Sequence, residues 1–215
     1  SLLMLMWLPA LFSFGLGFTL LSQLLALAAA AATGFISAKK AVKPLMAVRE
    51  PELRPYLCCV IPTVLLLCGL TLSHTLPHMP DGGLGSGQCT YGDMCMHLGF
   101  ITSMAEQGNF PFEYSILPGS RLCYPFLCDS VSASLYLLGL PLRAAYIVPM
   151  VFALAQVLCG GWFLGREIVH RRGAAVLAFI LFFLNGGLGM IYFMGDYSLT
   201  ELFTGFYTTP TNLTD

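Results

Sequence analysis

Long uncharged apolar blocks alternate with short polar segments along the chain. Four of these blocks are long enough, or nearly so, to cross hydrocarbon as helices, which takes about 20 residues. They cover 5–33, 56–73, 144–165 and 173–194. The pattern predicts an all-α, polytopic transmembrane helix bundle that forms a single transmembrane domain over 1–215. Because the chain begins in apolar sequence at Ser1 and ends in a polar segment, we expect it to be a fragment of a longer protein.

Composition and charge agree with this pattern and add an orientation. The chain is 57% hydrophobic, with a mean hydropathy of +0.77. Eight of its ten basic residues form two clusters: Lys39, Lys40, Lys43, Arg49 and Arg54 in one, and Arg166, Arg171 and Arg172 in the other. By the positive-inside rule both clusters are cytoplasmic. Residues 74–121 then form a long extracytoplasmic loop, and the last span emerges at Asp196 on the same side as this loop.

The apolar segment 122–140 differs from the four spans because it carries Asp129, a proline and three serines. If it crossed the membrane, every later helix would reverse and the second basic cluster would lie outside. A charge near the bilayer centre also costs a few kcal/mol. We therefore expect this segment to be interfacial or re-entrant, packed among other helices. An acid in such a place needs a partner, and Arg121 is near enough in sequence to be one.

The extracytoplasmic loop contains a predicted surface helix. Residues 74–88 are rich in Pro and Gly and indicate irregular chain. From Thr90 onward an apolar stripe recurs at helical spacing, formed by Met94, Leu98, Ile101 and Ala105. Gly, Asn and Pro in "QGNFP" (107–111) end the pattern. The sequence predicts an amphipathic helix of about 17 residues that lies along the membrane surface, with Asp93, His97 and Gln107 away from its apolar stripe.

Asp93 and His97 lie four residues apart on this predicted helix. Thr90 and Asp93 resemble a capping box, and an acid in a first helical turn is favoured by the helix dipole, so Asp93 has a structural interpretation besides a catalytic one. His97 is either an interfacial histidine satisfied by local polar groups or a partner of Asp93 in one hydrogen bond or metal site. A third metal ligand is missing from the local sequence. Tyr91 is a candidate for an interfacial aromatic belt.

The eight cysteines do not form a zinc-binding C-x-x-C pattern. Cys58, Cys59, Cys68 and Cys159 lie in apolar segments, where small buried side chains are expected. Cys89, Cys95, Cys123 and Cys128 lie in or beside the extracytoplasmic loop. Disulfides between these last four remain open, and their spacing does not show a connectivity.

The order of these parts resembles the N-terminal part of the C-fold (GT-C) polytopic membrane glycosyltransferases, such as protein mannosyltransferases, aminoarabinose transferases and oligosaccharyltransferase catalytic subunits. The likeness covers roughly 56–200. It is carried by "YGDMCMHLGFITSMAEQGNFP" (91–111), "YPFL" (124–127), "LLGLPLRAAYIVP" (137–149), "GREIVHRRGAA" (165–175) and "FMGDYS" (193–198). The chain departs from the family in having "YPFL" for His-Pro-Pro-Leu, Asp-Met for Asp-Glu at the first acid, and a second acid that stands alone.

The resemblance implies a glycosyltransferase that moves a sugar from a polyprenyl-phosphate donor to a glycan, lipid or protein acceptor. It implies a bacterial plasma membrane, with the active face extracytoplasmic and the lipid bilayer and donor as partners; we expect no nucleic acid. Asp93 and Asp196 would be the catalytic acids, and a divalent cation between them is left open as a cofactor. The substrate-binding residues would be His97, Arg121, Tyr91 and Asp129, with Arg121 on the phosphate.

Two other functions compete with this one. A transporter or flippase of a lipid-linked substrate would account for the acid within segment 122–140, although the sequence shows no internal repeat of the kind many transporters have. A non-catalytic membrane subunit would tolerate the change Asp93→Asn, whereas a transferase would not.

Overall fold

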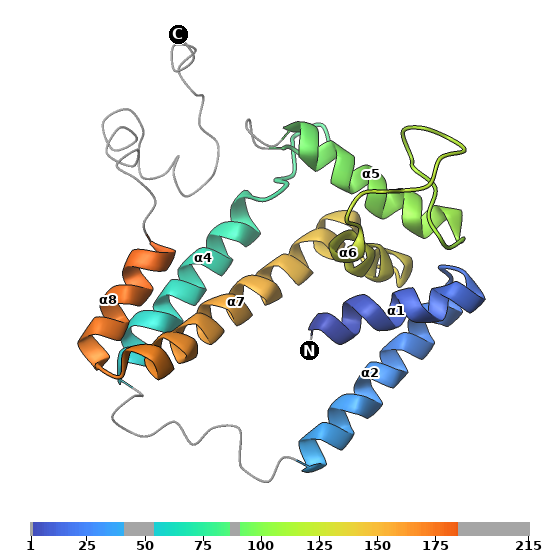
Figure 1. Cartoon of the computed structure of the whole chain (residues 1–215). Coiled ribbons are helices and arrows are strands. Elements are labelled where there is room, and N and C mark those ends of the chain that lie inside the picture. Colours follow the sequence, from blue (N-terminus) through green and yellow to red (C-terminus); the bar gives the residue numbers. More distant parts are fainter. Residues whose placement is uncertain (1, 41–53, 87–90, 185–215) are drawn as a thin grey trace. The chain divides into compact units, whose positions relative to one another are not determined.

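The computed structural model describes residues 2–40, 54–86 and 91–184, in which helices are joined by irregular segments and there are no strands. The elements are α1 (Leu2–Leu16), α2 (Leu20–Lys40), η1 (Tyr56–Val60), α4 (Ile61–His74), α5 (Tyr91–Gln107), α6 (Leu127–Leu137), α7 (Leu142–Val169) and α8 (Arg172–Phe183) (Figure 1). The chain divides into two compact units. The first contains residues 1–47 and 78–150, and the second contains residues 48–77 and 151–215.

Three helices in the described part of the chain are long and apolar enough to cross a membrane. They are Leu20–Lys39, Tyr56–His74 and Leu142–Val169. The protein is therefore a membrane protein, as its composition predicts. Of the predicted last span, 173–194, the structure describes only the part in α8, which ends at Phe183; Asp196 lies outside the described residues.

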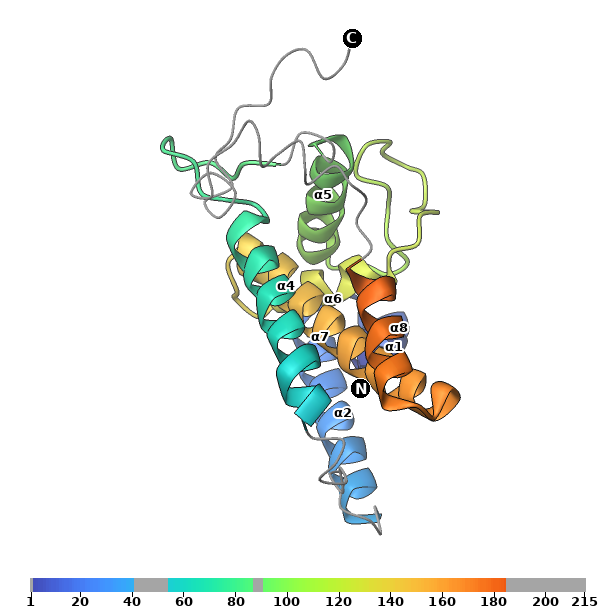
Figure 2. The ribbon, with the colours of Figure 1, turned by 90° about the vertical axis from the view of Figure 1, so that its left-hand side faces the viewer.

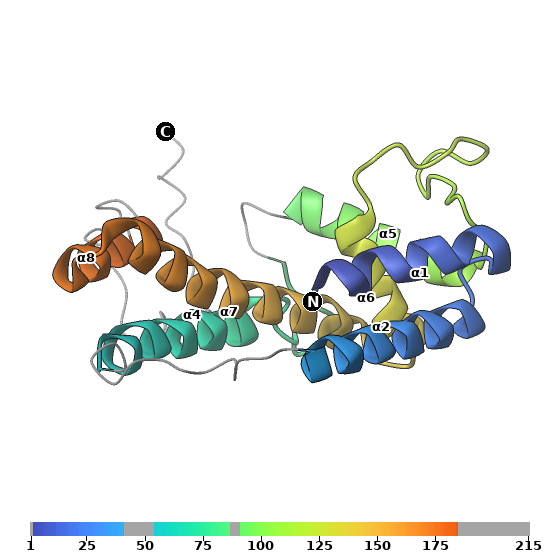
Figure 3. The ribbon, with the colours of Figure 1, turned by 60° about the horizontal axis from the view of Figure 1, so that its bottom comes forward.

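The first predicted span, 5–33, is two helices in the structure. α1 ends where Gly17 adopts the left-handed backbone conformation, with φ of 68°. α2 then begins with a reciprocal capping arrangement: the Thr19 amide donates to Ser22 Oγ at 3.0 Å, and the Ser22 amide donates to Thr19 Oγ1 at 3.4 Å. The chain turns back on itself at this point, so that α1 and α2 form a helical hairpin (Figure 3). A glycine in an uncharged run gave no sign of this turn in the hydropathy pattern.

The second span begins as a π-helix because of a proline. Pro62 has no amide proton, and its ring would collide with the carbonyl four residues earlier. The preceding turn widens: the Ile61 amide bonds to the Tyr56 carbonyl oxygen, five residues back, and η1 passes directly into α4.

The core of the second unit lies between α4, the second half of α7 and α8. Its buried residues are Val60, Leu158, Trp162, Ala175 and Phe179. α7 and α8 approach closely at Gly161, where an added Cβ would lie 2.7 Å from the Phe183 ring.

The core of the first unit is aromatic and joins the α1–α2 turn to α5, α6 and the loop after α5. Its buried residues are Phe18, Phe100, Ile101, Met104, Phe112 and Ala133. Phe18 and Phe112 meet edge to face, with ring centroids 5.1 Å apart. Figure 2 shows the loop returning past α5 on its way to α6. This core fixes the helices that carry the candidate site.

The helix predicted from Thr90 onward is present with the expected length, while its place along the membrane surface stays a prediction. α5 has 17 residues and ends at Gln107, followed by Gly108 with φ of 65°. The Gln107 side chain then holds the returning loop: its Oε1 accepts a hydrogen bond from the Glu113 amide at 3.0 Å, and its Nε2 donates to the Glu113 carbonyl at 3.2 Å. The apolar stripe packs on the first unit's core, with Ile101 and Ala105 buried.

Candidate functional site

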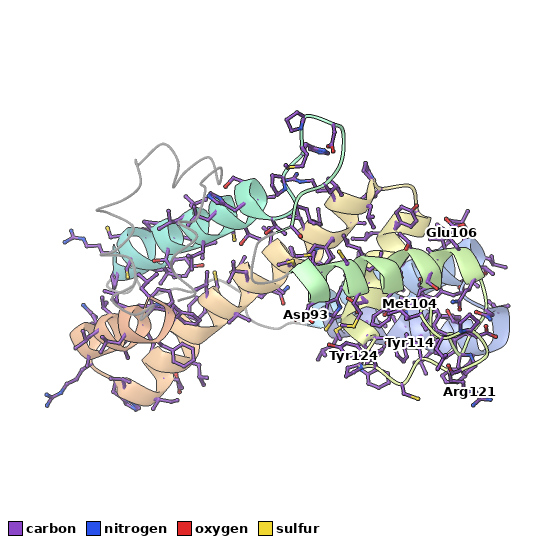
Figure 4. All side chains as sticks on the ribbon, turned by 90° about the horizontal axis from the view of Figure 1, so that it is seen from above. Asp93, Met104, Glu106, Tyr114, Arg121 and Tyr124 are labelled. Carbon is purple, nitrogen blue, oxygen red and sulfur yellow. The ribbon has the colours of Figure 1, made fainter. Side chains whose placement is uncertain are left out.

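Asp93 lies in the first turn of α5 and its side chain is exposed. A carboxylate in this position is stabilised by the positive end of the helix dipole. Figure 4 shows Asp93 at one end of α5 and Glu106 at the other. The carboxylate of Asp93 therefore faces the surroundings of α5 and takes no part in the core. The predicted capping partner, Thr90, lies outside the described residues.

His97 is one turn further along α5 and points to α6. Its Nδ1 lies 2.9 Å from Oδ2 of Asp129, a contact between residues 32 apart in sequence. The Asp129 side chain is 7% exposed and that of His97 27%. The imidazole therefore connects a buried carboxylate to the surface of the protein.

The environment of Asp129 opposes ionisation. Burial raises the pKa of this carboxyl above its usual value of 3.8, while the hydrogen bond and the charge of His97 act in the opposite direction. Asp129 lies in the first turn of α6, a helix of 11 residues, which is too short to cross a membrane. The acid is thus held in the folded interior by its partner and its helix terminus.

Aromatic rings fix the orientation of the imidazole. The His97 ring meets Tyr124 edge to face at 5.7 Å, and its centroid is 6.2 Å from that of Phe100. Phe100 in turn contacts Tyr114 at 5.7 Å. Tyr124 is 41% exposed, and Figure 4 shows Tyr114 and Tyr124 beside α5. The surface next to Asp93 and His97 therefore includes aromatic side chains, which can stack on the faces of sugar rings.

A second buried polar group lies on the same helix as Asp129. The Ser134 hydroxyl lies 2.7 Å from Oε1 of Gln23 and 2.7 Å from the Ser130 carbonyl oxygen, and its single proton serves one of them at a time. Gln23 Nε2 donates to Ser22 Oγ at 3.1 Å. These contacts connect α6 to α2 through hydrogen bonds between side chains that are almost fully buried.

The structure brings together some of the predicted site residues and separates others. His97 pairs with Asp129 of α6 and not with Asp93, its neighbour on α5. Arg121, which we expected beside Asp129, is exposed; its backbone bridges to Glu113, and Figure 4 shows it well away from Asp93. The reason is that the loop around Glu113 turns back on itself and carries Arg121 away from α6.

Two further predicted residues concern the ends of the candidate site. Asp196 and the side chain of Tyr91 lie outside the described part of the structure. A two-acid site formed by Asp93 and Asp196 therefore stays a prediction. Within residues 2–40, 54–86 and 91–184 no three His, Cys, Asp or Glu side chains come together as metal ligands.

The sequence contained a signal for the His97–Asp129 pair. An acid inside an apolar segment requires a partner, and a histidine on a neighbouring amphipathic helix is a candidate. Arg121 lies nearer to Asp129 along the chain, so the sequence alone favours it over His97. Gln23 gives no comparable signal, because an amide in a long uncharged run changes neither the charge pattern nor the predicted span.

Comparison with known proteins found no matching family model, no similar curated protein and no similar solved structure.

Proposed function

We propose that the protein is a membrane glycosyltransferase that moves a sugar from a polyprenyl-phosphate donor to an acceptor at the extracytoplasmic face. The observation that carries this proposal is the exposed carboxylate of Asp93 in the first turn of α5, one turn from the His97–Asp129 pair. A carboxylate, an imidazole and aromatic side chains on one surface suit the binding and activation of a sugar hydroxyl. The resemblance to GT-C enzymes described above supports the same assignment.

The arrangement of the first unit supports the extracytoplasmic placement of this surface. α2 has 21 residues and is about 31 Å long, close to the thickness of the hydrocarbon core. Its end carries Lys39, which the positive-inside rule assigns to the cytoplasm. Its beginning follows Gly17, which packs directly against the Gly108 carbonyl at the end of α5. α5 therefore belongs at the opposite membrane face from the lysine.

The proposed reaction places Asp93 at the acceptor. The acceptor oxygen attacks the anomeric carbon, the bond from that carbon to the donor phosphate breaks, and the polyprenyl phosphate leaves with the bonding electrons. Asp93 takes the proton of the acceptor hydroxyl, or holds a divalent cation together with Asp196. Tyr91 is proposed as a contact of the substrate, whereas Arg121 lies too far from Asp93 to contact a phosphate on the reacting carbon.

The test uses membranes that contain the intact protein and a labelled polyprenyl-phosphate sugar. The change Asp93→Asn keeps the size of the side chain and its position on α5 but removes the base. Loss of general base catalysis lowers rates by about 10²- to 10⁴-fold. We expect a loss in this range for Asp93→Asn and none for Glu106→Gln, which removes another exposed carboxylate from the same helix. Full transfer by Asp93→Asn would contradict the proposed catalytic role.

A transporter or flippase of a lipid-linked substrate is the second candidate. The buried polar contacts that connect Gln23 to Ser134, together with the buried acid of Asp129, favour it, because polar groups between apolar helices are typical of substrate pathways. Proteoliposomes with a fluorescent polyprenyl-phosphate sugar on one leaflet separate the two functions. A transporter moves the lipid between leaflets without an acceptor, and Asp93→Asn leaves this movement intact. A non-catalytic subunit shows neither activity.

A further inference from the structure

The hydrogen bond between Asp129 and His97 determines which nitrogen of the imidazole faces the surface. Nδ1 is 2.9 Å from Oδ2 of Asp129, so it is the nitrogen turned toward the buried carboxylate. Nε2, on the other side of the ring, has no hydrogen-bond partner among the described residues. When a carboxylate accepts a hydrogen bond from the N–H of one nitrogen of a neutral imidazole, the other nitrogen carries the free lone pair.

We propose that Asp129 is a positioning residue that holds His97 as the Nδ1-protonated tautomer, so that Nε2 is a second proton acceptor beside Asp93. This inference rests on the proposed function for the reaction that it serves. Asp93 takes the proton of the acceptor hydroxyl and passes it to Nε2, which regenerates the Asp93 carboxylate. In the resulting imidazolium, the Nδ1–H still donates its hydrogen bond to Asp129. The Nε2 proton is later released to water.

The geometry of α5 supports the transfer from Asp93 to His97. Side chains four residues apart on a helix have Cβ atoms about 5–6 Å apart and lie on one face. Asp93 is exposed and His97 is partly exposed, so both reach the same surface. An imidazole is also better matched than a carboxylate to proton transfer near neutral pH.

The surroundings of the imidazole allow this role and limit the alternatives. Tyr124 and Phe100 restrict rotation of the ring, so that an exchange of Nδ1 and Nε2 would require them to move. Tyr124 of the loop meets the His97 ring, Tyr146 of α7 lies near Asp129, and Asp93 lies one turn earlier on α5. None of these three is a cation, and Asp129 is the group within hydrogen-bond distance of Nδ1.

The first arm of the test measures the tautomer directly in the intact protein, labelled with ¹⁵N-histidine in lipid nanodiscs. The sequence has four histidines, and His97→Gln identifies the signal of interest. We expect the wild-type signal to show a protonated Nδ1 and an unprotonated Nε2 at pH 8. Asp129→Asn is expected to shift the proton toward Nε2. A wild-type Nε2–H form overturns the proposal without any variant, and so does a tautomer that Asp129→Asn leaves unchanged.

A control shows whether Asp129→Asn keeps the fold of the protein. The signals of His74, His78 and His170 report on other parts of the chain and should stay in place in Asp129→Asn. If these three signals move, the variant Asp129→Glu is used in place of Asp129→Asn. Asp129→Glu keeps a carboxylate and should retain the Nδ1-protonated form of His97. Loss of that form in a folded Asp129→Glu protein also counts against the proposal.

The second arm measures sugar transfer against pH. His97→Gln and Asp129→Asn are expected to lower kcat/KM by about 10² or more and to change the shape of its pH profile. If the pair were merely structural, the two variants would lower the amount of folded protein but leave the shape of the pH profile unchanged. Transfer with unchanged profiles in both variants overturns the inference alone. Absence of transfer in the wild type, with the tautomer as expected, overturns the proposed function and leaves the positioning by Asp129 established.

Discussion

At the scale of the residue, the main feature of this protein is a buried carboxyl that keeps a hydrogen-bonded partner. Burying an isolated carboxylate is costly, and such a group usually shifts its pKa or acquires a partner. Asp129 does both: burial raises its pKa, and His97 bonds to it at 2.9 Å. The effect of burial is the larger, so Asp129 binds its proton more readily in the folded protein than in the unfolded chain, and stability depends on pH. This dependence can be measured without knowing a substrate.

The stability of the protein should therefore depend on pH through Asp129. Because the folded pKa is raised above 3.8, the folded protein binds this proton more readily than the unfolded chain does. The contribution of the carboxyl to the free energy of unfolding is thus present at low pH and is lost as pH rises from 3.8 through the raised pKa. Asp129→Asn has no such group. Thermal unfolding in detergent should show that Tm of the wild type minus Tm of Asp129→Asn falls over this range.

The control for this measurement is Glu106→Gln, which removes an exposed carboxyl from α5. Water screens a charge in that position, so this variant should follow the wild type across the whole pH range. A difference between the wild type and Asp129→Asn that stays constant with pH would show that the burial of the acid has no energetic consequence in the folded protein.

At the scale of the element, the division of the first apolar block into α1 and α2 connects the membrane helices to the candidate site. Gly17 lies in the turn with φ of 68°, and an added Cβ would be 2.5 Å from the Gly108 carbonyl oxygen. Both contacting groups are backbone, so neither can rotate away. Phe18, next in the chain, is buried against Phe112. The turn therefore acts as the point where the helical hairpin and α5 are held together.

Replacing Gly17 by alanine should destabilise the protein. A left-handed backbone costs an L-residue about 1–2 kcal/mol, and contact with the Gly108 carbonyl adds to this cost. Gly15→Ala is a matched control, because Gly15 is helical and nothing lies within 4 Å of its added Cβ; this change should be neutral or stabilising by about 0.5–1 kcal/mol. Tm values in detergent decide the matter. Equal Tm values for the two variants would contradict the close approach at Gly17.

The elements also show what sequence can and cannot predict in this chain. The bounds of α5 followed from local chemistry, since apolar spacing defines the helix and Gly108 ends it. The turn at Gly17 did not, because a short break in an uncharged run leaves hydropathy almost unchanged. The pairing of His97 with Asp129 depends on a contact across 32 residues. Sequence indicated that Asp129 needs a partner, but the choice between Arg121 and His97 required the fold of the intervening loop.

At the scale of the whole molecule, the described residues of the candidate site all belong to the first unit. Asp93, His97 and Asp129 come from α5 and α6, and the aromatic core attaches these helices to the α1–α2 hairpin. The second unit contributes the apolar helix that contains α4, and the basic turn between α7 and α8. The sidedness of the site therefore depends on both units having the topology that the basic residues predict.

Reporter fusions test this topology. If segment 122–140 does not cross, α7 runs inward, and a fusion after Arg172 is cytoplasmic while a fusion after Asp196 is extracytoplasmic. α6 has only 11 residues, which span about 16 Å as a helix and cannot cross a hydrocarbon core of about 30 Å. An epitope inserted at Glu113 should be accessible from outside in the same cells. A fusion after Arg172 that lies outside would reverse the placement of α7 and contradict the proposed extracytoplasmic site. Two fusions in the cytoplasm would contradict the last predicted span and the extracytoplasmic place of Asp196.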